Sequence, residues 1–175
     1  RAVAHGGDRI AVKDGPLSLT YRELGDQALR LATVLQALGL GRGDRIAFLM
    51  ANCAAYVACE YAVARIGATR VPLAVLLGDD DHAYMMNFAH CRVLVYHAKF
   101  AARVAAVAPR LSCVEHFIRV GATAEPLPTG HRALETLLAS AGWIERDKQQ
   151  LQFHAARGAE QIGPLRWAGP LRPFS

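Results

Sequence analysis

Residues 20–50 read TYRELGDQALRLATVLQALGLGRGDRIAFLM and contain a helix start, a helix body, a helix stop and a strand. Thr20 and Glu23 stand three residues apart, which is the spacing of a capping box at a helix N-terminus. Apolar residues then recur every three or four positions, so one helix face is expected to be buried, and Gly39 provides the stop. These apolar residues are Leu24, Ala28, Leu31, Leu35 and Leu38. The nearly continuous apolar run Arg45–Met50 is typical of a strand covered on both faces, as in a parallel sheet.

Strand and helix patterns alternate on both sides of this stretch. Upstream, Arg9–Lys13 and Leu17–Thr20 flank the turn residues Asp14-Gly15-Pro16 and predict a hairpin. Downstream, helices are expected over Cys53–Ile66 (capped by Asn52), 80–89, Lys99–Val107 and His131–Ala141, and strands over Thr69–Val75, Arg92–Tyr96, Val114–Val120 and Gln150–Phe153. Pro72 indicates an edge strand or a bend. The alternation predicts an α/β fold with a layered, mostly parallel sheet and flanking helices, preceded by an N-terminal β-hairpin.

Composition narrows the class of protein. The chain has 175 residues, 53% of them hydrophobic and 20% charged, which suits one globular domain. No apolar run reaches the ~18 residues of a membrane-spanning helix. The net charge is +5, but the basic residues are scattered and no aromatic-plus-basic cluster accompanies them, so nucleic-acid binding is not expected. The four cysteines form no C-x-x-C pair and no secretory leader is evident, so we expect reduced thiols and a cytoplasmic protein.

Candidate phosphate and metal sites are weak. The glycines Gly39, Gly41 and Gly43 follow a helix and open a strand, which is the reverse of a dinucleotide-binding loop, so a helix stop and a tight turn explain them. Asp79–Asp81 could be read as a divalent-metal site, but a solvated helix start is favoured. The neighbours His90 and Cys91 diverge on a helix, so an ordinary helix end is favoured over a metal pair. No catalytic, cofactor-binding or metal-ligating residue is assigned.

The order and spacing of several short motifs carry a family resemblance. These are Thr20–Leu24, Gly43–Ala47, Asn52, Gly67-Ala68, Val71–Leu73, Ala83-Tyr84 and Arg92–Val95. Together they resemble the N-terminal region of the adenylate-forming enzymes, which include the acyl-CoA synthetases, the adenylation domains of peptide synthetases and the luciferases. The resemblance covers residues 9–120 well and extends more loosely to 153. The chain departs from the family pattern at Ala74-Val75, where Asn-Pro is common, at His82, where an apolar residue is common, and at His90-Cys91, where a small-residue turn is usual.

The resemblance implies an acyl-adenylate-forming ligase, which converts a carboxylic acid and ATP to acyl-AMP and then to an acyl-CoA thioester. ATP, Mg and CoA are therefore implied for an intact family member. Leu151-Gln152-Phe153 resembles the strand before the family's ATP phosphate loop, but His154–Gly158 replace the expected loop, and the later ribose-binding and lysine motifs have no counterpart. We expect this chain to bind none of these cofactors and to be inactive alone.

The expected organisation is a partial N-terminal subdomain of an AMP-binding synthetase over 1–153 and a flexible, non-homologous tail over 154–175. The tail is rich in Gly and Pro and repeats Gly-Pro-Leu-Arg, which suggests a shifted reading frame or a truncated gene. Since Arg1 is not Met and follows no leader pattern, the start is expected to be the interior of a longer frame.

Two alternatives remain. The chain could be a non-catalytic interaction module that docks on a partner or on a full-length homologue through apolar surface on the helix Cys53–Ile66. It could also be a small independent nucleotide-binding protein, although no phosphate loop follows a strand.

Overall fold

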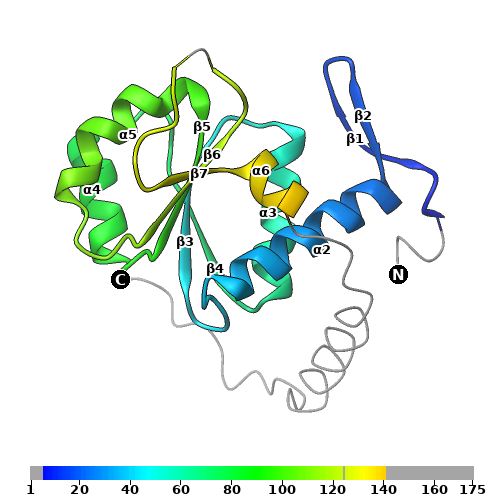
Figure 1. Ribbon diagram of the computed structural model, residues 1–175, viewed down its shortest axis with the longest axis horizontal. Coiled ribbons are helices and arrows are strands. Elements are labelled where there is room, and N and C mark those ends of the chain that lie inside the picture. Colours follow the sequence, from blue (N-terminus) through cyan, green and yellow to red (C-terminus); the bar gives the residue numbers. More distant parts are fainter. Residues whose placement is uncertain (1–5, 124, 141–175) are drawn as a thin grey trace, which may run out of the picture. The chain divides into compact units, whose positions relative to one another are not determined.

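The computed structural model describes residues 6–123 and 125–140. Within these ranges, five parallel strands form one sheet in the order β4-β3-β5-β6-β7, with helices on both faces (Figure 1). The strands are β3 (Arg45–Leu49), β4 (Thr69–Pro72), β5 (Val93–His97), β6 (His116–Val120) and β7 (His131–Ala133). A separate antiparallel hairpin pairs β1 (Ile10–Asp14) with β2 (Leu17–Thr20). The predicted α/β class, with a hairpin before a layered parallel sheet, is confirmed.

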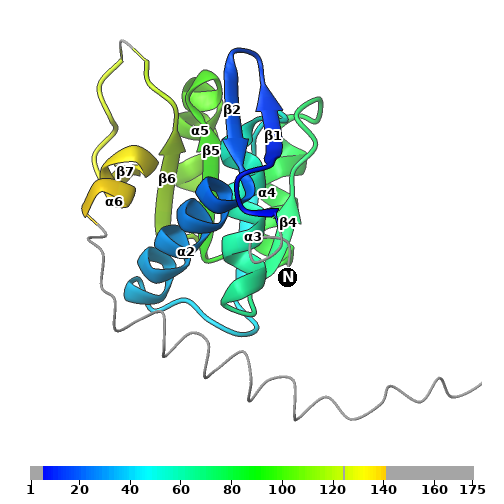
Figure 2. The same ribbon diagram turned by 90° about the vertical axis from the view of Figure 1, so that its right-hand side faces the viewer.

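The helices lie in two layers. The first layer holds α2 (Tyr21–Ala37), α3 (Ala54–Arg65) and α6 (Leu134–Ser140), and the second holds α4 (Asp79–Phe88) and α5 (Ala101–Val107). Single 3₁₀ turns, η1 (Ala98–Phe100) and η2 (Ala108–Arg110), flank α5. Figure 2 shows the hairpin at the start of α2, and α6 with β7 at the opposite end of the sheet from β4.

The start of α2 confirms the predicted capping box. The Thr20 hydroxyl accepts a hydrogen bond from the Glu23 amide (3.2 Å), and the Glu23 carboxylate accepts one from the Thr20 amide (2.8 Å). Hydrogen bonds from the Thr20 amide and hydroxyl lower the pKa of Glu23. The predicted apolar face is buried at Leu24, Ala28, Leu31 and Leu35, and Gly39 adopts the left-handed conformation (φ +76°) that ends the helix.

Alternate residues of β3 and β5 enter two separate cores, because successive side chains on a strand point to opposite faces. Ile46, Phe48, Val93 and Val95 pack under α2, α3 and α6. Ala47, Leu49, Leu94 and Tyr96 pack under α4 and α5. Strand β3 is therefore covered on both faces, as its apolar run predicted.

The structure corrects several local expectations. The helix expected from His131 begins at Leu134, because His131–Ala133 pairs with β6 as a short strand. Asn52 is not the cap of α3: Cys53 is at the N-cap position and makes no side-chain cap hydrogen bond. The strand expected over Thr69–Val75 ends at Pro72, at the sheet edge where proline is tolerated.

Other expectations lie outside the described residues: the strand over 150–153, the end of the helix at Ala141 and the tail 154–175. Among the helices that the structure describes, none is long and apolar enough to cross a membrane.

Candidate functional site

The strand order identifies the part of the sheet where a ligand is expected. The chain passes from β3 outward to β4 and then returns to β5 on the other side of β3. In open parallel sheets, ligands bind beyond the carboxyl ends of the strands, near the point where the order reverses. The candidate site is therefore the carboxyl edge of the sheet around β3.

A pocket of about 530 Å³ opens at this edge. It lies where β3 and β4 end, between the first turn of α3 and the segment after β4. Its lining is mostly apolar, with the Asn52 amide and the Tyr56 hydroxyl as polar groups. The lining residues are Phe48, Met50, Ala51, Asn52, Tyr56, Pro72, Leu73, Ala74 and Val75. Such a surface suits an apolar group better than a phosphate.

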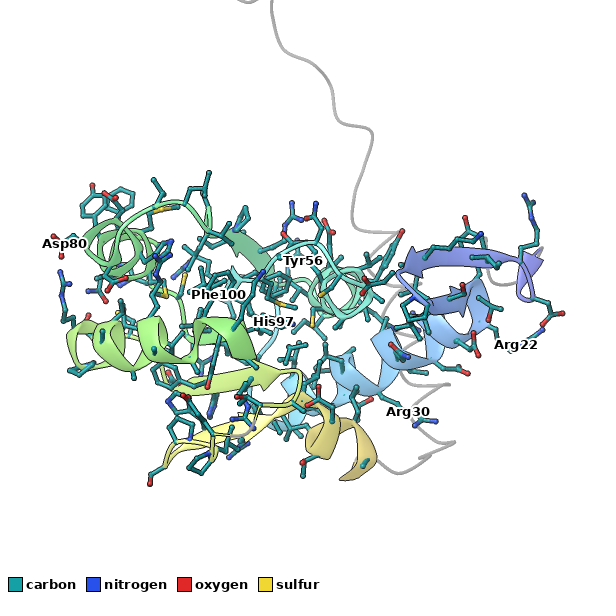
Figure 3. The ribbon with its side chains drawn as sticks, turned by 90° about the horizontal axis from the view of Figure 1, so that it is seen from above. Arg22, Arg30, Tyr56, Asp80, His97 and Phe100 are labelled. Carbon is teal, nitrogen blue, oxygen red and sulfur yellow. The ribbon has the colours of Figure 1, made fainter. Side chains whose placement is uncertain are left out.

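Contacts from three elements hold the side of the pocket formed by Tyr56, a residue of α3 that is labelled in Figure 3. The Tyr56 ring meets Phe48 edge-on, with centroids 5.4 Å apart. Arg70 of β4 donates to the Tyr56 hydroxyl (3.3 Å) and also pairs with Glu60 of α3. At the start of α3, the Asp14 carboxylate of the hairpin accepts a hydrogen bond from the Ala54 amide (2.9 Å). The hairpin thus caps the helix that carries Tyr56.

Side chains from α4 and α5 hold the opposite wall. His82 is 1% exposed, and its Nε2 donates to the Ala74 carbonyl (2.9 Å). Arg103 donates to the Val75 carbonyl (2.9 Å) and pairs with Asp79 (3.2 Å). His82, where the family commonly has an apolar residue, therefore supports the segment that lines the pocket.

The glycine-rich turn after α2 does not fit a phosphate. It lies at the amino ends of the strands, and Gly39 and Gly43 have left-handed φ values of +76° and +88°, as a helix stop and tight turn require. The Asp44 carboxylate accepts from the Gly41 amide (2.8 Å) and pairs with Arg92 (3.0 Å). Burial raises the pKa of Asp44, but the Gly41 amide and Arg92 outweigh it, and the pKa is lowered. A carboxylate already occupies the turn.

The three carboxylates that begin α4 are partnered as a helix start rather than gathered around a metal. Asp79 pairs with Arg103, Asp80 pairs with Arg110 (2.8 Å) and Asp81 accepts from the Gly78 amide (3.3 Å). In residues 6–123 and 125–140, no three His, Cys, Asp or Glu side chains converge as metal ligands. The Asp79, Asp80 and Asp81 carboxylates therefore serve the start of α4, and no reaction step is assigned to them.

His90 and Cys91 diverge, but not on a helix as expected: α4 ends at Phe88, and His90 lies in the turn that follows, with a left-handed φ of +50°. Burial raises the pKa of the Cys91 thiol to about 11, whereas His90 Nδ1 lies 3.4 Å from Cys113 Sγ on the surface.

Sequence reasoning did not identify the pocket. A usable signal was present, because Asn52–Tyr56 and Leu73–Val75 each follow a strand of the same parallel sheet.

Comparison with known proteins agrees with this architecture. A family model described as AMP-binding enzyme matches residues 1–150. The chain is 39% identical over 101 residues to a 3-hydroxybenzoate/4-hydroxybenzoate-CoA ligase of Thauera aromatica, covering 57% of this chain and 19% of that protein. It is 35% identical over 147 residues to a feruloyl-CoA synthase of an Amycolatopsis species, covering 82% and 30%.

Solved structures share the fold. The coronafacic acid ligase of Pectobacterium brasiliense superposes with a TM-score of 0.72 at 22% identity, covering 79% of this chain and 27% of that one. This chain thus spans less than a third of the length of the curated relatives described above. The match of the family model to residues 1–150, together with the parallel sheet and hairpin, shows that the chain belongs to the AMP-binding enzyme family.

Proposed function

We propose that this chain supplies the N-terminal scaffold of an acyl-adenylate-forming ligase and does not catalyse the reaction alone. The observation that carries the proposal is the family match over residues 1–150, and the apolar pocket at the carboxyl edge of the described sheet supports it. The names of the related CoA ligases support a carboxylic acid as substrate and CoA as acceptor.

The proposed reaction of the complete enzyme has two displacements. A carboxylate oxygen attacks the α-phosphorus of ATP, and the bond to pyrophosphate breaks to give acyl-AMP. The CoA thiol then loses its proton and attacks the acyl carbon, and AMP leaves. The protein contributes to the first step mainly by positioning the reactants and neutralising phosphate charge. Removal of one transition-state donor costs on the order of 10²- to 10³-fold in rate, so a chain without the whole set is expected to be inactive.

Carboxylate-dependent exchange of radiolabelled pyrophosphate into ATP tests the proposal. The purified chain should show no exchange above a protein-free blank with benzoate, ferulate or a fatty acid. The feruloyl-CoA synthase relative, assayed in parallel with ferulate, provides the positive control. Robust exchange by this chain would show that it contains the phosphate-handling groups and would overturn the proposal.

We also propose a boundary at residue 153, with 154–175 unrelated to the family. The family match ends at residue 150, which supports a boundary near this point. Reading the encoding DNA beyond the Phe153 codon in all three frames tests the idea: an alternative frame should restore a Ser/Thr/Gly-rich loop. If no frame does so, the frameshift explanation is wrong.

A second candidate function is a module that docks on a partner protein or a full-length homologue. Exposed apolar side chains favour it: Tyr61 on α3 is 58% exposed, Tyr84 and Phe88 on α4 are 66% and 74% exposed, and Leu76 before α4 is 96% exposed. Size-exclusion chromatography of the chain, alone and with a full-length relative, tests this function; a monomer that binds nothing counts against it.

The cysteines at positions 53, 59, 91 and 113 are free, which supports our proposal of a cytoplasmic location.

A further inference from the structure

Arg119 occupies an unusual position for an arginine. It is the fourth residue of β6, near the carboxyl end of the strand, and its register partner on β5 is Tyr96. The residue is only 9% exposed. Since arginine is rarely buried unless its charge is paired, its surroundings are expected to contain an anion.

The described residues provide no such anion. Arg119 Nη1 donates a long hydrogen bond (3.3 Å) to the neutral backbone carbonyl of Glu125, and Nε is buried without a partner. None of the ion pairs among residues 6–123 and 125–140 includes Arg119. The Glu135 carboxylate, at the start of α6, instead accepts from the Gly121 amide (2.8 Å). The positive charge of Arg119 is therefore uncompensated within this part of the chain.

Tyr96 and His131 lie near Arg119 and can hydrogen-bond, but neither side chain carries a negative charge that would neutralise the guanidinium. The Tyr96 hydroxyl and His131 Nδ1 share a hydrogen bond of 2.7 Å, and the His131 ring stacks on Phe117 with centroids 4.5 Å apart. Burial, and then the Arg119 charge, lower the pKa of His131, so its imidazole is neutral at pH 7. Burial raises the pKa of Tyr96, which keeps its phenol protonated.

We propose that Arg119 is the cationic centre of a binding site for the oxyanion group of a small ligand, either a carboxylate or a phosphate, at the carboxyl end of β6. The bound oxyanion replaces the Glu125 carbonyl and accepts hydrogen bonds from two guanidinium nitrogens, a geometry that suits both kinds of anion. The position agrees with the general preference of parallel sheets for ligands at their carboxyl edge. The site is distinct from the apolar pocket at β3 and β4, and it does not depend on the proposed ligase function.

Thermal unfolding of the full chain tests the site, because a ligand that binds only the folded state raises the melting temperature. Sodium phosphate and sodium benzoate are titrated separately, each against sodium chloride at equal ionic strength. We expect a saturable rise in Tm beyond the chloride effect with at least one probe. A rise with phosphate alone assigns a phosphate group, and a rise with benzoate alone assigns a carboxylate.

Two variants make the test specific to Arg119. Arg119→Met removes the charge while keeping an apolar side chain, and it should abolish the saturable rise. Arg132→Gln removes one charge from an exposed position on the neighbouring strand β7 and should leave the rise unchanged. Retention of the rise in Arg119→Met, or no rise with either probe in the unsubstituted chain, would overturn the proposal.

A second measurement tests the proposed oxyanion site if Arg119→Met does not fold. The His131 ring signals of the unsubstituted chain are followed by NMR during the same titrations. Occupation of the site should shift these signals with the same saturation midpoint as the rise in Tm, and Arg119→Lys, which keeps the charge but loses the planar fork, should weaken binding. Unshifted His131 signals at saturating probe would also refute the site.

Discussion

Replacing Asp14 should destabilise a helix that lies 40 residues away in the sequence. The Asp14 carboxylate, in the last residue of β1, accepts the hydrogen bond from the Ala54 amide at the start of α3 (2.9 Å). The cap position itself holds Cys53, which provides no side-chain hydrogen bond. Asp14→Ala therefore leaves a partly buried amide without its acceptor.

Two contributions determine how far Asp14→Ala lowers the free energy of unfolding. Loss of a capping acceptor costs about 1 kcal/mol, with a range of about 0.5–2. A negative charge at a helix N-terminus contributes a further ~0.3–1 kcal/mol. Asp14→Ala should therefore lower the free energy of unfolding by about 1–2 kcal/mol. Asp14→Asn keeps an acceptor oxygen and loses only the charge, so its loss should be about half as large or less.

Urea unfolding followed by circular dichroism measures both changes, and the midpoint should fall without a change in slope. Lys13→Ala, at the exposed neighbouring position on β1, is the control and should stay within about 0.5 kcal/mol of the unsubstituted chain. The reasoning fails if Asp14→Ala matches that control. Equal losses for Asp14→Ala and Asp14→Asn would instead show that charge, and not the hydrogen bond, stabilises the helix.

Three further outcomes are expected. Phe48→Ala, at a side chain of β3 that is 1% exposed, should lower the free energy of unfolding in urea by about 3–5 kcal/mol. Cys59, whose thiol pKa is raised to about 12 by burial, should not react with Ellman's reagent until the chain unfolds, whereas the partly exposed Cys113 should react in the folded chain. The pKa of Asp44 is lower in the folded chain than in the unfolded chain. Its contribution to stability should therefore be present above about pH 4 and should disappear as the pH falls through the folded-state pKa. Acid titrations of the unsubstituted chain and of Asp44→Asn measure this difference.

Local patterns were sufficient to predict most elements of the fold. The capping box at Thr20 and Glu23, the helix stop at Gly39 and the apolar run of β3 each depend on neighbouring residues and fixed spacings. The short strand β7 was missed for a physical reason: His131–Ala133 is held as a strand by pairing with β6, and three residues carry too little periodicity to reveal a partner far away in sequence.

The supports of the candidate sites could not be predicted, because they join residues that are remote in sequence. Asp14 caps α3 across 40 residues, and Arg103 reaches Val75 across 28. Arg119 is likewise placed between Tyr96 of β5 and Ala133 of β7, which its neighbours in the chain do not reveal. A sequence pattern can indicate that a residue is charged, but only the tertiary structure shows whether that charge has a partner.

The distribution of polar groups around the sheet bears on our proposal that this chain is a ligase scaffold that does not catalyse the reaction alone. Parallel strands place the loops that follow them at one edge, and chemistry there requires polar groups that remain available to a ligand. Around the ends of β3 and β4, three polar side chains from other elements bond to the scaffold: Asp14 caps α3, and His82 and Arg103 hold the pocket wall. Arg119, at the end of β6, retains donor capacity that the described residues do not use. If titration shows no oxyanion there, the unpartnered guanidinium does not mark a binding site, and its buried charge has no ligand of the two classes tested.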